Sequence, residues 1–300
     1  MFLSCLHYTI GAGELHMKRY WKEIILLVLV FSNILVWSVL HQNKLTDTLT
    51  VSFLDIGQGD AIFIDSPQHG RVLIDGGKNR KVLSELTKVL PFGDKRIDIV
   101  IATHPDLDHI RGLPEVVDRY DVSIFLESGV PSNNSTYEEL LKMVSDKNIS
   151  KLLARRGMII NFGDGAKLYI LYPLPNTDLK NFDPNDASIV AKLVYGKESF
   201  LLTGDAEIKT ENALVHIDGS KLKSDVLKAG HHGSKTSSSL PFVEQVLPVT
   251  TIISAGLNNS YGHPHQEVLD RFNEIGSTIL NTALVGSITF KTDGEDLRLK

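Results

Sequence analysis

The sequence has a single cysteine, Cys5, among its 300 residues. One thiol excludes an internal disulfide framework and also excludes a zinc site built from several cysteines. A basic excess is missing too: the net charge of −5 gives no whole-chain positive field, so composition alone does not indicate nucleic-acid binding. It does not exclude an anionic substrate, because a bound metal ion supplies local positive charge. Histidines and aspartates are therefore the informative residues.

Only one segment departs from the globular pattern. Residues 24–40 contain no charge, and Trp21 and Trp37 lie near the two ends of this run. The segment is slightly shorter than the roughly 20 residues that usually span a bilayer, but its ends carry the aromatic residues typical of an interface. No small-residue cleavage site follows, which favours an uncleaved transmembrane signal anchor over a cleaved signal peptide. A buried core helix is the other alternative.

The flanks of this segment predict its orientation. Three basic residues precede it, so the positive-inside rule predicts cytoplasmic residues 1–23 and places the chain after about residue 42 outside the cell.

Met17, followed by KRYWKE, resembles a natural start, and residues 1–16 are then a mis-annotated extension. N-terminal sequencing of the native protein tests that. Residues 41–47 are expected to be a polar linker, and residues 48–300 the folded domain that carries the motifs described below.

Short strands and helices alternate after the linker. Three strands separated by turn-rich segments come first, and a β-branched strand, RIDIVIAT, follows a helical segment. A helix is expected from residue 135, with Ser135 as its N-cap and Glu138 in the capping-box position. Strands ahead of helices in each half, with hairpins mixed in, predict two packed sheets covered by outer helices.

The string THPDLDH, residues 103–109, follows the RIDIVIAT strand directly. His104 and Asp106 can point at one metal ion, and Asp108 and His109 can point at a second position nearby. Imidazole and carboxylate together suit Zn, Mn or Fe. The alternative is a solvated polar loop, which four ligand-type residues within six positions disfavour.

Three further segments place metal-competent side chains after strands. Asp205 ends LLTGD, the adjacent His231 and His232 follow in LKAGHHGS, and His263 and His265 lie in YGHPH. Adjacent histidines at a strand end cannot face the same way, so one can bind metal while the other serves substrate or proton transfer. Upstream, the glycines of DIGQGD and LIDGG permit close backbone approach, or they are ordinary hairpin punctuation.

Together these strings resemble the metallo-β-lactamase superfamily and, within it, the extracellular domain of the ComEC family of DNA-uptake proteins. The matching strings, in order, are DIGQGDA, LIDGG, THPDLDHIRG, NDASIV, LLTGD, LKAGHHGSKTSS and SYGHPH, and they cover roughly residues 48–292. The resemblance implies an α/β fold, the αββα metallo-β-lactamase sandwich, here preceded by a single N-terminal transmembrane helix. It also implies a dinuclear metal site in a groove at the edge of the sandwich.

The resemblance also implies roles for individual residues. His104 and Asp106 would bind one metal ion, Asp108 and His109 the second, and Asp205 would bridge them; His231 or His232, and His263, would complete the shells. Many members have a further histidine ligand where this chain has Asn185-Asp186, so Asp186 is a candidate extra ligand. Arg111 replaces a glycine common in the family and could contact an anionic substrate. Gly233, Ser234 and Lys235 could hold a substrate phosphate through backbone N–H groups and the ammonium.

The implied function is a membrane-anchored extracellular hydrolase that uses two divalent ions, Zn or Mn, to cleave the phosphodiester bonds of DNA. Asp108 would orient the nucleophile, and His231 or His232 would protonate the leaving oxygen. Competence or other cell-surface machinery is the expected partner. Two alternatives stay open: hydrolysis of a different ester, as by a phosphorylcholine esterase or a lactonase, and a metal-bound binding module without catalysis.

Overall fold

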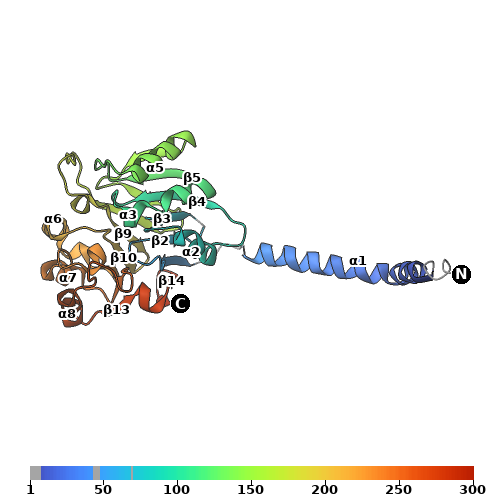
Figure 1. Cartoon of the computed structure of the whole chain (residues 1–300). Coiled ribbons are helices and arrows are strands. Elements are labelled where there is room, and N and C mark those ends of the chain that lie inside the picture. Colours follow the sequence, from blue (N-terminus) through green and yellow to red (C-terminus); the bar gives the residue numbers. More distant parts are fainter. Residues whose placement is uncertain (1–7, 43–47, 69) are drawn as a thin grey trace. The chain divides into compact units, whose positions relative to one another are not determined.

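The computed structural model describes residues 8–42, 48–68 and 70–300, in two units that divide at residues 44 and 45. The N-terminal unit is the helix α1 (Tyr8–Gln42), which contains the predicted anchor at residues 24–40 (Figure 1). Within it, Tyr20–Trp37 is long and apolar enough to cross a membrane, and none of this stretch is buried. The predicted extension 1–16 and linker 41–47 lie partly outside the described residues.

The larger unit holds two sheets. In the first, β1 to β3 and β14–β15 are antiparallel, whereas β3, β4, β5 and β6 run parallel, in the order β15-β14-β1-β2-β3-β4-β5-β6. Its strands are β1 (Leu49–Phe53), β2 (Ile62–Asp65), β3 (Arg71–Ile74), β4 (Arg96–Ala102), β5 (Asp121–Glu127), β6 (Ser150–Leu153), β14 (Ile288–Thr292) and β15 (Leu297–Leu299).

The second sheet repeats this plan in the order β13-β12-β11-β10-β9-β8-β7. Strands β7 to β10 are antiparallel, and β10 to β13 are parallel. Its strands are β7 (Ile159–Asn161), β8 (Lys167–Tyr172), β9 (Val190–Tyr195), β10 (Glu198–Leu202), β11 (Val226–Lys228), β12 (Thr250–Ile253) and β13 (Thr278–Asn281).

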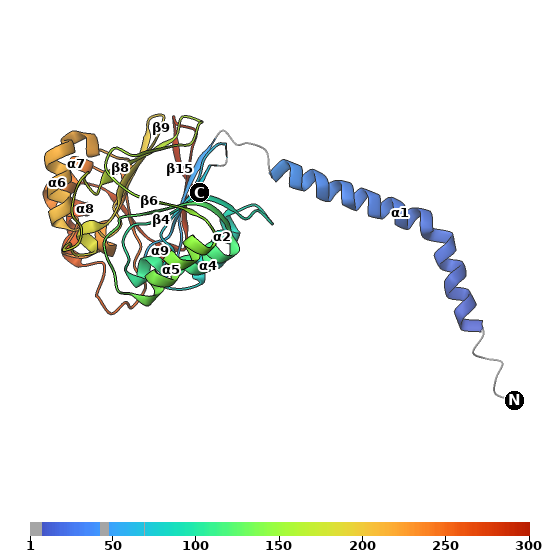
Figure 2. The same cartoon turned by 90° about the horizontal axis from the view of Figure 1, so that it is seen from above.

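Helices cover the outer face of each sheet, as Figure 2 shows from above. Those beside the first sheet are α2 (Lys81–Val89), α3 (Leu107–Ile110), α4 (Leu113–Arg119) and α5 (Ser135–Asp146). Those that follow strands of the second sheet are α6 (Ile208–Asp218), α7 (Leu240–Val246), α8 (Gln266–Glu274) and α9 (Thr282–Val285). Short 3-10 turns complete the described elements: η1 (Asn185–Ala187), η2 (Gly219–Leu222) and η3 (Gly230–Gly233).

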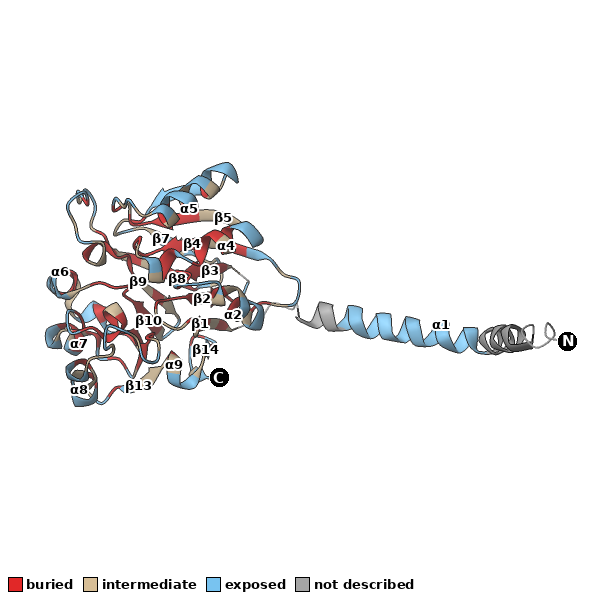
Figure 3. Cartoon of the chain, in the orientation of Figure 1, coloured by how far each residue is buried: buried red, intermediate tan, exposed pale blue. Residues whose placement is uncertain are grey.

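The strands are apolar on both faces, because each sheet lies between its partner sheet and a helical layer. In β2, Ile62 and Ile64 join the core between the sheets, whereas Phe63 joins the core beneath α2, α4 and α5. In β10, Leu202 faces the core between the sheets and Leu201 faces the core beneath α6, α7 and α8. Strands buried on both faces read as continuous apolar runs. Figure 3 shows these buried strands with exposed helical surfaces outside. The predicted αββα metallo-β-lactamase sandwich is confirmed.

One predicted helix start is wrong by one residue. The N-cap of α5 is Asn134 and not Ser135, because the Asn134 side chain accepts hydrogen bonds from the backbone N–H of Thr136 at 2.9 Å and of Tyr137 at 3.3 Å. An asparagine caps as well as a serine. The shift leaves Ser135 as the first helical residue.

The parallel strands determine where the polar motifs come together. Strands β3 and β4 of one sheet, and β10, β11 and β12 of the other, are each followed by one of the motifs described above. The carboxyl ends of parallel strands meet at one edge of a sheet, where α/β folds commonly bind ligands. The two sheets therefore bring their polar loops to a shared edge.

Candidate metal centre

Asp60, His109, Asp205 and His232 offer ligand atoms that all lie within 4.8 Å of one another, and Asp108 adjoins this group through His232. The His232 Nε2 atom lies 3.3 Å from Asp108 Oδ2, 3.2 Å from Asp205 Oδ2 and 3.3 Å from His109 Nε2. His109 Nε2 is 3.2 Å from Asp205 Oδ2. Ligands about 2.0–2.1 Å from a tetrahedral ion stand about 3.3 Å apart, so the spacing fits a divalent cation at the centre.

The far side of each imidazole faces a buried carboxylate. His109 Nδ1 is 2.8 Å from Asp75 Oδ2, and His232 Nδ1 faces Asp60 Oδ1 at 3.5 Å. Thr103 holds Asp75 in turn, donating from its backbone N–H at 2.8 Å and from its hydroxyl at 2.7 Å. A carboxylate behind a histidine fixes the ring and directs the other nitrogen toward a metal. Asp60 and Asp75 therefore serve as supports behind the proposed ligands.

His104 and Asp106 form an adjoining position. His104 Nε2 is buried without a hydrogen-bond partner among the described residues, and it stands 3.8 Å from Asp106 Oδ2. Its Nδ1 contacts the Thr103 hydroxyl at 3.0 Å, and the ring lies 4.2 Å from that of His109. A buried polar atom without a partner is costly unless something binds it. These residues fit a second cation beside the first.

The electrostatics of the cluster also fit bound cations. Burial alone would lower the pKa of His109 and of His232, but the carboxylates around them, Asp205 foremost, hold the first well above its usual value and raise the second to about 10. Burial lowers the pKa of His104 to about 3, helped by the charge of His109. Protons on His109 and His232 thus balance the carboxylates in the metal-free protein. Metal binding would replace them.

The adjacent histidines separate as expected, and the geometry favours His232 as the ligand. His231 is partly exposed; its Nδ1 lies 3.1 Å from Glu207 Oε1 and its Nε2 is 3.8 Å from Asp205 Oδ2. Both residues adopt positive φ, 44° and 56°, a strained conformation that turns the two rings apart. His263 lies beside them: its ring centre is 5.4 Å from that of His231, and its buried Nδ1 has no partner among the described residues. It remains a candidate ligand at the rim.

Other predicted residues lie apart from the cluster. Asp186 Oδ2 pairs with Lys209 at 3.2 Å, and the Asp186 backbone carbonyl accepts from the Thr210 hydroxyl at 2.9 Å, whereas Asp186 Oδ1 is buried without a partner among the described residues, so its ligand role stays a prediction. Arg111 ends α3 and is exposed at the surface. It faces the groove described below.

The Gly233-Ser234-Lys235 segment differs from its prediction. The Ser234 N–H donates to the His231 carbonyl at 2.8 Å, and the Lys235 N–H donates to His265 Nδ1 at 3.2 Å. These N–H groups are therefore engaged inside the loop, and the exposed Lys235 ammonium is the group left for a phosphate. Gly233, at φ 83° with Pro264 only 2.7 Å from the place of a Cβ, is a packing requirement.

Sequence reasoning missed Asp60, Asp75 and Lys228. The Lys228 side chain is fully buried, and its Nζ contacts Asp60 Oδ2 at 2.5 Å, the Gly204 carbonyl at 3.0 Å and Asp205 Oδ1 at 3.5 Å. The signal for the two aspartates was present, since each stands beside glycines after or before an apolar strand. Their carboxylates, and not only those glycines, belong to the site.

Position 59 must be glycine because the backbone of Asp108 passes too close to it to leave room for a side chain. A Cβ at this position would lie 1.9 Å from the Asp108 carbonyl oxygen, and φ is +110°. We expect Gly59→Ala to displace α3 and the ligands on it, lowering the bound metal content and the melting temperature together. Metal analysis and thermal unfolding measure both. Gly57→Ala is the control, since it has positive φ but nothing within 4 Å of its Cβ. Equal effects of the two substitutions would contradict the steric explanation.

Comparison with known proteins finds related sequences. The model of the metallo-beta-lactamase superfamily matches residues 54–153. ComE operon protein 3 of Bacillus subtilis is 34% identical over 260 residues, covering 80% of this chain and 33% of that protein. Competence protein ComA of Neisseria gonorrhoeae is 30% identical over 244 residues, covering 80% of this chain and 32% of that protein. The chain thus spans about a third of the length of these relatives.

Among solved structures, CmlA, a diiron β-hydroxylase from Streptomyces venezuelae, superposes with a TM-score of 0.53. The match covers 81% of this chain and 54% of that one at 14% identity. A likeness at this identity concerns the fold alone.

Proposed function

Since this chain is a metallo-β-lactamase-fold protein whose sequence resembles the ComEC-type competence proteins, we propose that it is a membrane-anchored phosphodiesterase that uses two divalent metal ions and acts on DNA outside the cell. One observation carries the proposal. The buried His109, His232 and Asp205 side chains adjoin a second candidate position at His104, whose ring centre lies 4.2 Å from that of His109. Two cation positions side by side are the arrangement used for hydrolysis of phosphate esters.

The chain's context supports the substrate and the location. The relatives at 30–34% identity include a protein named for competence, which points toward DNA. The apolar stretch Tyr20–Trp37, preceded by basic residues, supports an anchor with the domain on the outer side. Zn and Mn are both compatible with imidazole and carboxylate ligands.

The proposed metal ligands and the carboxylates behind them have different roles. His104 and Asp106 would hold one cation, and Asp108, His109 and His232 the other. Bound cations would neutralise charge on the phosphate and supply an activated water near neutral pH. Asp60 and Asp75 keep the two inner imidazoles in orientation.

A proton donor for the leaving oxygen is available at the rim. The Glu207 carboxylate lies 3.1 Å from His231 Nδ1 and orients the ring, whose Nε2 is 3.8 Å from Asp205 Oδ2. The Thr236 hydroxyl donates to the same carboxylate at 2.7 Å and fixes it. We assign His231 the general-acid role and the Lys235 ammonium a phosphate contact.

The proposal is tested by hydrolysis assays of the full-length chain in detergent. The protein is stripped with a chelator, reloaded with Mn²⁺ or Zn²⁺, and offered bis-p-nitrophenyl phosphate, single-stranded DNA and duplex DNA. We expect two bound metal equivalents and turnover of the small diester and of DNA, lost on chelation and restored on reloading. A phosphorylcholine ester and a lactone are assayed in parallel. Turnover of one of these with intact DNA would replace the proposed substrate, and two-metal binding without turnover of any would indicate a binding module.

A further inference from the structure

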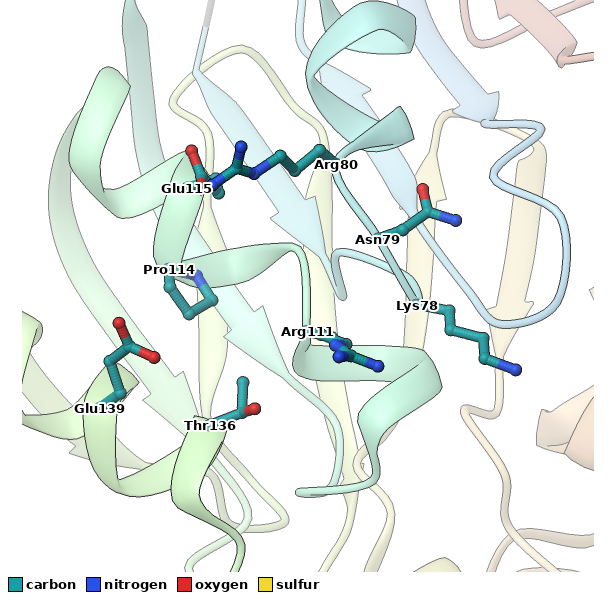
Figure 4. A pocket seen from close by; sticks show the side chains of 8 residues that line it. All are labelled: Lys78, Asn79, Arg80, Arg111, Pro114, Glu115, Thr136 and Glu139. Carbon is teal, nitrogen blue, oxygen red and sulfur yellow. Dashed lines mark ion pairs between the residues drawn. The ribbon is translucent and has the colours of Figure 1, made fainter.

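A groove lies beside the candidate metal centre and plays no part in the chemistry above. It has a volume of about 640 Å³. Its walls come from the segment after β3, from the turn after α3, from α4 and from α5 (Figure 4). The lining side chains that matter for its charge are Lys78, Arg80, Arg111, Glu115 and Glu139.

The groove is fixed to the metal centre through the backbone. Arg111 is the C-cap of α3 and follows Asp108 by three positions, a spacing that brings two side chains to the same helix face. The Gly76 N–H donates to the His109 carbonyl at 2.6 Å, and the Gly112 N–H donates to the Gly77 carbonyl at 3.1 Å. The segment that carries Lys78 is thereby bonded to the helix that carries the proposed ligands. A molecule bound in the groove would be held in register with the metals.

The charges in the groove are unequally balanced. Glu115 is ion-paired with Arg80 and also with Arg119 at 3.2 Å, so its negative charge is already satisfied. Lys78 and Arg111 are exposed and have no ion pair among the interactions of the described residues. In Figure 4 they extend on the side away from Glu139, which lies on α5 across the groove. The side of the groove that carries Lys78 and Arg111 is therefore cationic.

We propose that this groove binds the sugar–phosphate backbone of a polynucleotide strand next to the phosphate being cleaved, with Lys78 and Arg111 contacting flanking phosphates. The inference rests on the proposed function and deepens it, since it makes the substrate a strand and not a small ester. Phosphate contacts of this kind set the register of a nucleic acid without reading its sequence. The carboxylate of Glu139 limits how far the strand can extend along the groove.

The test measures binding of the metal-loaded, full-length protein to a fluorescent single-stranded 20-mer with a phosphorothioate backbone, which resists hydrolysis. At low salt, Lys78→Ala/Arg111→Ala is expected to weaken binding at least tenfold. It should also reduce the slope of log affinity against log salt by about 1.4, or roughly 0.7 for each lost phosphate contact. Glu139→Lys, which adds a cation, should tighten binding and steepen the slope. Lys95→Ala/Lys221→Ala removes two exposed cations elsewhere and serves as the control.

Activity supplies the second readout. The ratio of kcat/KM on a 20-mer to kcat/KM on bis-p-nitrophenyl phosphate should fall at least tenfold in Lys78→Ala/Arg111→Ala. The groove inference is overturned if that variant binds DNA like the control, or if Glu139→Lys does not tighten binding. The proposed function fails separately, when the wild-type protein with both metals cleaves neither substrate. Loss of DNA binding in the groove variant would then still support the groove.

Discussion

An Asp108→Ala/His109→Ala variant is expected to lose at least about 10³-fold of the wild-type kcat/KM on bis-p-nitrophenyl phosphate, equivalent to about 4 kcal/mol of transition-state stabilisation. The two side chains supply two of the four atoms that stand 3.2–3.3 Å from neighbouring members around the inner cation position. Removing His109 breaks the group in which Asp60, His109, Asp205 and His232 offer ligand atoms within 4.8 Å of one another, and removing Asp108 takes away the adjoining carboxylate. We expect the bound metal to fall below two equivalents at the same time.

Metal analysis and steady-state kinetics on the same preparation check this expectation. Asp118→Ala/His216→Ala is the matched control, because it removes an aspartate and a histidine that are exposed on α4 and α6. The control should keep both metal equivalents and full turnover. Wild-type turnover in Asp108→Ala/His109→Ala would show that the chemistry does not take place at this cluster.

The fold could be predicted from the sequence because local and tertiary patterns agree. Strands such as β10 are apolar at successive positions, which fits burial on both faces, and the sheets turned out to be covered on both sides. What escaped prediction were short elements without periodicity. The helices α3 (Leu107–Ile110) and α9 (Thr282–Val285) have only four residues each, too few to display a helical repeat.

The candidate site was predictable where its residues are close in sequence. His104, Asp106, Asp108 and His109 stand within one short string, and their side chains lie together. The choice between His231 and His232 needed the structure, since positive φ at both residues sets the ring directions. Such a backbone conformation leaves no mark on hydrophobic periodicity.

Prediction of the supporting residues Asp60 and Lys228 required the tertiary structure. Asp60 follows β1 and Lys228 ends β11, and these strands belong to different sheets. Only the packing of the two sheets against each other brings Lys228 Nζ to within 2.5 Å of Asp60 Oδ2. In the sequence, a lysine at a strand end next to Ala-Gly reads as a solvated terminus. Its complete burial is a property of the fold.

Replacing Lys228 by methionine is expected to reduce the free energy of unfolding by about 3–5 kcal/mol, because removing one partner leaves buried carboxylates without their counterion. Asp60 is 1% exposed and Asp205 2% exposed, so water cannot take over the role of the ammonium. For a domain of this size the loss corresponds to a fall in Tm of roughly 6–20 °C. Thermal and urea unfolding in the presence of a chelator measure it without compensation by bound cations.

Lys192→Met is the matched control for this prediction. The Lys192 ammonium donates to the carbonyls of Lys221, at 2.8 Å, and Lys223, at 2.5 Å, so its removal leaves no carboxylate unpaired. We expect a loss of about 1 kcal/mol, typical of hydrogen bonds to neutral groups. If Lys228→Met costs no more than this control, the buried ammonium is not what balances the aspartates.

A second substitution separates charge from packing. Lys228→Met/Asp60→Asn should regain part of the stability lost in Lys228→Met, because asparagine needs no counterion, whereas a loss due to packing would persist or grow.

The effect of Lys228→Met on the free energy of unfolding should also depend on pH. Burial favours the neutral form of Asp60, but Lys228 and His232 hold the pKa of Asp60 below its usual value in the wild type. The contribution of the Asp60–Lys228 pair to the free energy of unfolding is therefore present above the unfolded pKa and is lost as the pH falls. Without Lys228 that pKa rises, and the stability difference between wild type and Lys228→Met should narrow toward acid pH. A difference that is constant from pH 8 to pH 4 would assign the loss to packing of the lysine stem and not to its charge.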